Sequence, residues 1–177
     1  MRIIAGQWKG RKWQVQVTNH TRPTTDFVRE ALAGILESKF SLSEVSFLDL
    51  FAGTGAVSFE LRSRGCLQVT AIEKNTKVYQ YLKAATSELE MQEVQLIKTD
   101  AYRFLSQNTT PFDIIFADPP YADSQVAQIP DWVFTRSLLS HAGLLIIEHD
   151  SKHFFDAQTH FREMRKYGNT RLSFFSW

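Results

Sequence analysis

The sequence predicts an α/β fold built on a mostly parallel, seven-stranded sheet. Three observations support this. Beyond residue 45, short β-rich runs alternate with helical stretches, as in a parallel sheet covered on both faces. The last two β-rich runs are joined only by Gly168-Asn169, and a two-residue turn can join antiparallel strands only. A separate segment with glycine, tryptophan and basic residues precedes this body and predicts a small β-hairpin.

The N-terminal hairpin is expected from runs 3–6 and 12–15, which flank residues 7–11. We expect residues 23–177 to form one domain and residues 1–22 to form a basic hairpin arm that extends it. Apolar residues recur at helical spacing over 26–39, so a helix is expected there, capped by Thr25 or Asp26. No internal repeat or low-complexity segment is evident.

The remaining elements follow the alternating pattern. The strands are expected at 45–50, 68–73, 94–98, 112–117, 143–148, 161–167 and 170–177. The helices are expected at 56–64, 75–89, 101–107, 124–140 and 151–157.

Composition limits the class of protein. The chain has 177 residues, 44% of them apolar and 22% charged, which is enough for one soluble core without disulfides or a structural metal. The single cysteine, Cys66, has no partner in the chain, and no Cys/His spacing fits a metal site, so we expect a reducing, cytoplasmic location and no metal. No apolar run approaches the roughly 20 residues of a membrane helix, and no signal peptide is evident.

Charge is divided unevenly along the chain. Residues 1–22 carry five basic and no acidic side chains, and residues 151–177 carry five basic and two acidic ones. Residues 23–150 carry ten basic and 17 acidic side chains, so the net charge of +1 combines basic ends of +8 with a body of −7. Basic ends suit a polyanionic partner, although ordinary solvated surface charge would give the same count.

The first chemical motif is Asp49-Leu50-Phe51-Ala52-Gly53-Thr54-Gly55, between an expected strand and an expected helix. Glycines there permit a tight turn and close approach of a ligand. No Gly-Lys-Ser/Thr follows, so the motif is not a phosphate-binding loop. Ser58 stands where the dinucleotide fingerprint requires glycine or alanine. Because a carboxylate repels phosphates and accepts hydrogen bonds from an ammonium group, Asp49 favours a ligand with an amino-acid part.

Two further acids lie at the ends of the next two expected strands, since Glu73 ends the strand 68–73 and Asp100 follows the strand 94–98. Glu73 can accept hydrogen bonds from both hydroxyls of a ribose. Asp100, followed by Ala101, can accept one from an adenine amino group, and it can also cap the helix from residue 101.

The most informative motif is Asp118-Pro119-Pro120-Tyr121, after the strand 112–117. Two prolines remove backbone donors and stiffen the chain, which leaves carbonyls available as acceptors. A planar amine on a nucleobase needs two acceptors and a flat surface. Asp118, the Pro119 carbonyl and the Tyr121 ring can supply them.

The two motifs together resemble the class I S-adenosylmethionine-dependent amino-methyltransferases, whose fold is Rossmann-like. Residues 2–12 (RIIAGQWKGRK) and 22–30 (RPTTDFVRE) closely resemble the bacterial RsmD family, over nearly the whole chain. That resemblance implies methylation of the N2 amine of a guanine in small-subunit (16S) ribosomal RNA. It also implies a cytoplasmic monomer that acts on an assembling 30S particle.

The resemblance assigns roles to named residues. Asp118, Pro119 and Tyr121 would hold the base, and the methyl donor would lie against Asp49, Phe51, Gly53, Gly55, Glu73, Asp100, Ala101 and Thr24. Phe27 is a further candidate for the methionine end of the donor or for the core. The RNA would be gripped by Trp8, Lys9, Arg11, Lys12, Arg22 and Arg29.

Three alternatives stay open at this point. The protein could methylate adenine N6 or a glutamine, or it could bind RNA during assembly without catalysis. An NAD enzyme is disfavoured by Ser58. His149 and His153 lack a third metal ligand and are interpreted as ordinary histidines.

Overall fold

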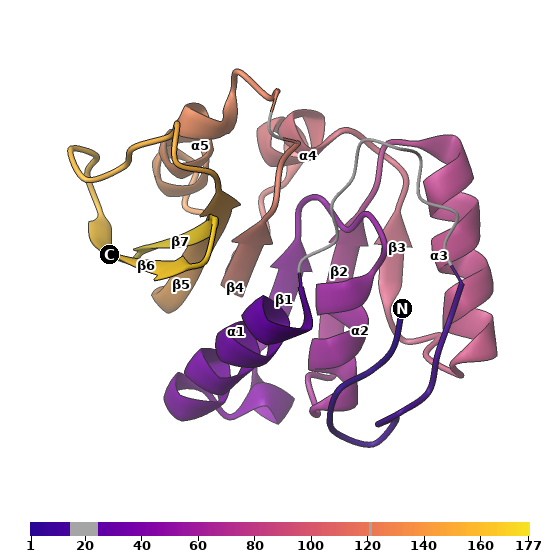
Figure 1. The fold of residues 1–177 in the computed structure, drawn as a ribbon. Helices are drawn as coiled ribbons and strands as arrows, with labels where there is room; N and C mark the ends of the chain where they lie inside the picture. The colour runs from indigo at the N-terminus through magenta and orange to yellow at the C-terminus, as the bar shows by residue number, and fades with distance from the viewer. Residues whose placement is uncertain (15–24, 121) are drawn as a thin grey trace.

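One sheet organises the described part of the chain, residues 1–14, 25–120 and 122–177 of the computed structural model, with the strand order β3–β2–β1–β4–β5–β7–β6 (Figure 1). The strands are β1 (Ser46–Asp49), β2 (Gln68–Ile72), β3 (Gln95–Ile97), β4 (Phe112–Ala117), β5 (Leu139–His149), β6 (Phe161–Tyr167) and β7 (Thr170–Phe175). β1 to β5 pair in parallel, whereas β7 runs antiparallel to both β5 and β6. The predicted sheet with its antiparallel C-terminal hairpin is confirmed.

The helices cover the sheet on both faces because strand residues alternate between two cores. Phe47, Ile114 and Ile146 belong to one core, and their neighbours Leu48, Ile115 and Ile147 belong to the other. The helices of the first core are α1 (Asp26–Lys39), α2 (Ala56–Ser63) and α3 (Thr76–Glu88). Those of the second are α4 (Ala101–Gln107) and α5 (Ile129–Thr135), and the short 3-10 turns are η1 (Leu42–Glu44) and η2 (Val126–Gln128).

Two predicted elements were wrong in extent or in kind. Instead of one helix over 124–140, η2 and α5 are followed by β5, which starts at Leu139. Pro130 begins the helix, and Ser137, with a φ of 53°, ends it. β5 also runs close beside β4 at Gly143, where a Cβ atom would lie 2.8 Å from the Asp113 carbonyl oxygen.

The helix expected at 151–157 is replaced by turns. The Asp150 carboxylate accepts a hydrogen bond from the Lys152 backbone N–H and so closes a local turn that competes with a helix. The next side chains then point in different directions, because Phe154 is exposed and Phe155 is buried.

The N-terminal segment pairs as predicted, with an antiparallel bridge between Arg2 and Lys12 and backbone hydrogen bonds from Ile3 to Arg11 and from Trp13 to Met1. It packs against α2. Ile3 and Trp13 are buried in the first core, and Gly6 approaches Ser63 so closely that a Cβ atom would lie 1.9 Å from the Ser63 carbonyl oxygen. Because Gly6 also has a φ of +83°, this contact requires glycine.

A buried ionic network fixes the N-terminal segment. The Glu60 carboxylate accepts hydrogen bonds from the backbone N–H groups of Ile4 and Ala5, at 2.8 and 3.0 Å. It also accepts one from Nε of Arg64 at 2.8 Å and lies 3.8 Å from Nη1 of Arg29. Glu60 therefore joins the N-terminal segment, α1 and α2 at a point that is closed to solvent.

We predict that Glu60→Ala lowers the free energy of unfolding by about 3–5 kcal/mol, because it removes a buried carboxylate that pairs with Arg29 and Arg64 and accepts hydrogen bonds from two backbone N–H groups. Urea denaturation measures the change. Glu37→Ala removes the more exposed carboxylate that pairs with Arg64, so it serves as the control and should cost less than about 1 kcal/mol. Equal losses in the two variants would contradict a special role for Glu60.

Candidate functional site

The glycine turn connects β1 to α2 at the carboxyl edge of the sheet. The backbone N–H of Leu50 donates to the Phe116 carbonyl, and that of Ala52 donates to the Ile72 carbonyl, so the turn is fixed between β4 and β2. Gly53 and Gly55 have positive φ values of 51° and 76°. At Gly55 a Cβ atom would lie 2.6 Å from the Phe59 ring, so this position requires glycine.

Trp13 supports the turn from the core side. Its indole N–H donates to the Thr54 carbonyl oxygen at 2.9 Å, and its ring packs edge-on against Phe59. The sequence did not reveal this role, since a tryptophan in a basic segment gives no sign of which residue it will contact. The N-terminal segment is thus part of the frame of the site.

Asp49 ends β1 beneath the turn, and its side chain is only 1% exposed. Ser58 donates a hydrogen bond to Oδ2 at 2.7 Å, whereas Oδ1 makes no hydrogen bond of regular geometry within the described part of the chain. Burial raises the pKa of Asp49 to about 6, and the Ser58 hydrogen bond opposes part of that rise. A buried carboxyl oxygen that lacks a hydrogen bond of regular geometry fits a ligand that brings an ammonium group.

Glu73 follows β2 and faces the same turn. Its Oε2 accepts from the Gly53 backbone N–H at 3.1 Å, and its Oε1 accepts from the Asn75 N–H at 2.6 Å. Burial raises the pKa of Glu73, although these N–H groups favour the ionised form. The carboxylate is therefore fixed beside the turn, with acceptor capacity left for hydroxyl donors.

Asp100 lies after β3 and caps α4, accepting from the backbone N–H groups of Tyr102 and Arg103. Its Oδ2 lies 3.6 Å from Nζ of Lys74. Nearby, the Phe51 and Tyr102 rings meet edge to face, with centroids 6.0 Å apart. The Asp100 cap and the Phe51–Tyr102 pair lie beyond Glu73, and a flat ring can lie against them.

Asp118, Pro119 and Pro120 directly follow β4, which pairs with β1 on one side and with β5 on the other. Since the carboxyl ends of neighbouring parallel strands meet at one edge, Asp118 and the glycine turn share that edge. The third residue of the motif, Tyr121, lies outside the described residues.

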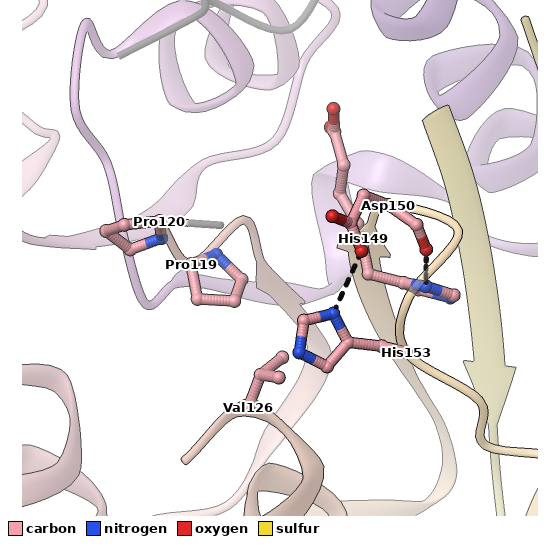
Figure 2. A pocket seen from close by; sticks show the side chains of 7 residues that line it. Pro119, Pro120, Val126, His149, Asp150 and His153 are labelled. Atoms are coloured by element: carbon pink, nitrogen blue, oxygen red, sulfur yellow. Dashed lines mark hydrogen bonds and ion pairs between the residues drawn. The ribbon is translucent and has the colours of Figure 1, made fainter. Parts of the chain in front are cut away.

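A small hollow opens beside the two prolines. Its lining is shown in Figure 2 and consists of Pro119, Pro120, Val126, Glu148, His149, Asp150 and His153. His153 Nδ1 lies 3.1 Å from Asp150 Oδ1, and the His149 ring hydrogen-bonds through Nδ1 to the Asp150 carbonyl and through Nε2 to Ser173. Burial lowers the pKa of His149.

The two histidines had been interpreted as ordinary, yet they lie beside the proline motif. The signal available in the sequence was their position, because both closely follow the expected strand 143–148, which is the next one along the chain after that of Asp118. Their alignment with Pro119 and Pro120 depends on the strand order, which the sequence leaves open.

The structure corrects two of the expected RNA contacts. Arg29 is 1% exposed and donates to Asp26, to the Arg2 carbonyl and to the Ala56 carbonyl. Trp8 is 9% exposed and packs under the Arg62 guanidinium. Both side chains hold the N-terminal segment on the domain and are not available to RNA.

The other predicted contacts have different positions. Arg11 is partly exposed and donates to the Glu88 and Leu89 carbonyls at the end of α3, whereas Lys9 and Lys12 are exposed. Phe27 is 67% exposed, so it is not a core residue. Arg22 and Thr24 lie outside the described residues. Within residues 1–14, 25–120 and 122–177, no helix is long and apolar enough to cross a membrane.

Comparisons with known proteins agree with this geometry. The model of the family described as "Conserved hypothetical protein 95" matches residues 1–176. The chain is 34% identical over 148 residues to "Ribosomal RNA small subunit methyltransferase D" of Escherichia coli, covering 84% of this chain and 74% of that protein.

Solved structures agree as well. An Escherichia coli structure provisionally described as a methyltransferase has a TM-score of 0.86 and 30% identity, over 99% of this chain and 96% of that one. An RNA methyltransferase of Salinibacter ruber, solved with S-adenosyl-L-homocysteine, has a TM-score of 0.68 at 12% identity, over 87% of this chain and 92% of that one, and so shares the fold. The predicted fold class is confirmed.

We predict that Asp49→Asn stabilises the free protein above pH 6. The folded-state pKa of about 6 exceeds the ordinary value of 3.8, so the wild type loses stability as the pH rises through 6, whereas the variant has no charge to bury. The gain should approach about 3 kcal/mol near pH 8 and vanish near pH 4. Urea denaturation across this range measures it.

Asp131→Asn is the matched control, because it makes the same substitution at an exposed position in α5. A stability difference for Asp49→Asn that does not change between pH 4 and pH 8 would show that ionising the Asp49 carboxyl group in the folded protein has no cost.

Proposed function

The chain belongs to the family of ribosomal RNA small subunit methyltransferase D, and from this we propose that it transfers the methyl group of S-adenosylmethionine to the exocyclic N2 amine of a guanine in 16S ribosomal RNA. The observation that carries the proposal is the position of two groups on adjacent strands. A buried carboxyl group with a spare oxygen ends β1, and Asp118-Pro119-Pro120 follows β4. The first suits an amino-acid-bearing cofactor, and the second suits a planar amine.

The residues around the glycine turn fit S-adenosylmethionine. Asp49 Oδ1 would accept a hydrogen bond from the ammonium group, and Glu73 would accept hydrogen bonds from the ribose hydroxyls. Asp100 and Ala101 would border the adenine, beside Phe51. When bound, the sulfonium group supplies an electrophilic methyl carbon.

Asp118 and Pro119 act on the substrate amine. The lone pair of a guanine N2 is delocalised into the ring, so the amine is a weak nucleophile. Acceptance of its two hydrogens by the Asp118 carboxylate and the Pro119 carbonyl would orient the remaining lone pair, and orientation can supply up to about 7–11 kcal/mol. As positive charge develops on nitrogen, Asp118 stabilises it and can take the proton.

The target base must leave its stack to reach this edge of the sheet, at a cost of a few kcal/mol. We propose that Tyr121 recovers part of that cost by stacking on the base, worth roughly 1–3 kcal/mol. Lys9 and Lys12 are exposed and would contact RNA phosphates, and we propose the same role for Arg22. We propose that Thr24 contacts the methionine end of the cofactor.

The resemblance to the RsmD family supports three finer proposals. We propose that the substrate is the RNA within an assembling 30S particle, that the enzyme acts as a monomer and that it works in the cytoplasm. A comparison of methyl transfer to free 16S transcript and to partly assembled particles tests the first. Sedimentation at several protein concentrations tests the second.

We predict that Asp118→Ala lowers methyl transfer to 16S RNA by about a hundredfold or more, since it removes the group that stabilises the developing charge. Transfer of a labelled methyl group is measured, followed by analysis of the modified nucleosides, with N2-methylguanosine as the expected product. The affinity for S-adenosylmethionine should stay within about threefold of the wild type.

The exposed carboxylate variant Asp131→Asn is the control and should retain full activity. Equal rates for Asp118→Ala and the wild type would remove Asp118 from the mechanism. An N6-methyladenosine product would exclude guanine N2, and RNA binding without cofactor binding would favour a noncatalytic assembly factor.

A further inference from the structure

The connection between β5 and β6 holds three consecutive side chains in three environments. His153 lines the hollow beside Pro119 and Pro120 (Figure 2). Phe154 is 72% exposed, whereas Phe155 is 2% exposed and packs in the core against Phe175. Phe155 is thus held in the core and His153 at the hollow, and the exposed ring of Phe154 lies between them along the chain.

A cation lies against this exposed ring. The guanidinium carbon of Arg171 lies 5.7 Å from the centroid of Phe154, and its Nη1 lies 3.5 Å from the Ser151 carbonyl oxygen. Arg171 is opposite His149 in the β5–β7 register and opposite Lys166 in the β6–β7 register. His149, Arg171 and Lys166 therefore form a row across three strands, starting at the hollow.

Both signs of charge lie around the row, and its acidic neighbours along the chain are Glu148, Asp150, Asp156 and Glu163. Lys152 and Lys166 are exposed, and the Glu163 carboxylate is paired with Arg165. The Asp150 carboxylate accepts hydrogen bonds from the Lys152 backbone N–H and from His153. Basic side chains at the end of the chain thus flank the exposed ring, whereas Trp8 and Arg29 near its start face inward.

We propose that Phe154 and Arg171 form a platform for an unpaired RNA nucleotide next to the methylated base. The base of that nucleotide stacks on the Phe154 ring, and its phosphate binds Arg171 and Lys166. A single nucleotide can contact both the Phe154 ring and the Arg171 guanidinium, because its base has a flat π-face and its phosphate is an anion on the same nucleotide. The platform rests on the proposed function for the identity of its substrate.

The experiment compares Phe154→Ala and Arg171→Gln with wild type in binding to a single-stranded decaribonucleotide and in methyl transfer to 16S transcript. Phe154→Ala should raise the RNA Kd and KM about tenfold, the effect of losing one stacked base, and leave kcat and cofactor affinity unchanged. Phe154→Tyr should restore binding. Arg171→Gln should weaken binding and lower the slope of log Kd against log salt by about 0.7.

Two exposed residues at the opposite edge of the sheet supply the controls. Leu67, which precedes β2, and Arg136, which follows α5, are replaced in Leu67→Ala and Arg136→Gln, and both variants should bind RNA within about twofold of wild type.

The outcomes separate the two proposals. If wild type methylates 16S RNA and Phe154→Ala binds RNA as tightly as wild type, the platform is overturned and the proposed function stands. If wild type transfers no methyl group but Phe154→Ala still weakens RNA binding and Phe154→Tyr restores it, the proposed function fails and the platform stands. If wild type binds neither the decaribonucleotide nor the 16S transcript, the platform is overturned.

Discussion

The buried carboxyl group of Asp49 is the constraint on which the site depends. A carboxyl group that is closed to solvent and has one oxygen without a regular hydrogen bond raises the free energy of the folded state, so the surroundings must hold it in place. The glycine turn is tied to β2 and β4, and Trp13 fixes the turn through the Thr54 carbonyl. Burial of the Asp49 carboxyl group has a cost in stability, and it leaves a buried acceptor that the ammonium group of a ligand would satisfy.

The N-terminal segment contributes to this site from behind. Its backbone binds the Glu60 carboxylate, and Trp13 binds the glycine turn, so the first residues of the chain and α2 form one unit. The basic and aromatic composition of this segment had suggested an RNA-binding arm. Trp8 of this segment instead packs under Arg62 within the protein. Arg29 of α1, also expected to contact RNA, pairs with the buried Glu60, which shows why a count of basic residues cannot separate a surface for a polyanion from an internal ion pair.

Much of the fold could be predicted from sequence because its signals are local. The bounds of α1 and α4 agree with the predicted helices, since a capping residue begins each one, and β4 agrees because its apolar run ends at Asp118. The position of the glycine turn, Glu73 and the proline motif at one edge also follows from the polarity of parallel strands, whereas their order along that edge does not. The early start of β5 depends on contacts with a distant segment, such as the close approach to β4 at Gly143, and no periodicity records those. The turns after His149 come from a local hydrogen bond of the Asp150 carboxylate, which an apolar pattern does not record either.

The direction of the last strands decides what the C-terminus can do. β7 runs antiparallel to β5, so β7 begins at the edge where β5 ends, and Arg171 lies opposite His149. A parallel strand in the same position would place its first residues at the opposite edge, far from Asp118 and the glycine turn. β6 returns the chain to the carboxyl edge and β7 starts there after the turn at Gly168, so Arg171 packs against Phe154 and lies opposite Lys166. β7 is antiparallel to its neighbours in an otherwise parallel sheet, and this direction therefore places the basic side chain of Arg171 at the carboxyl edge.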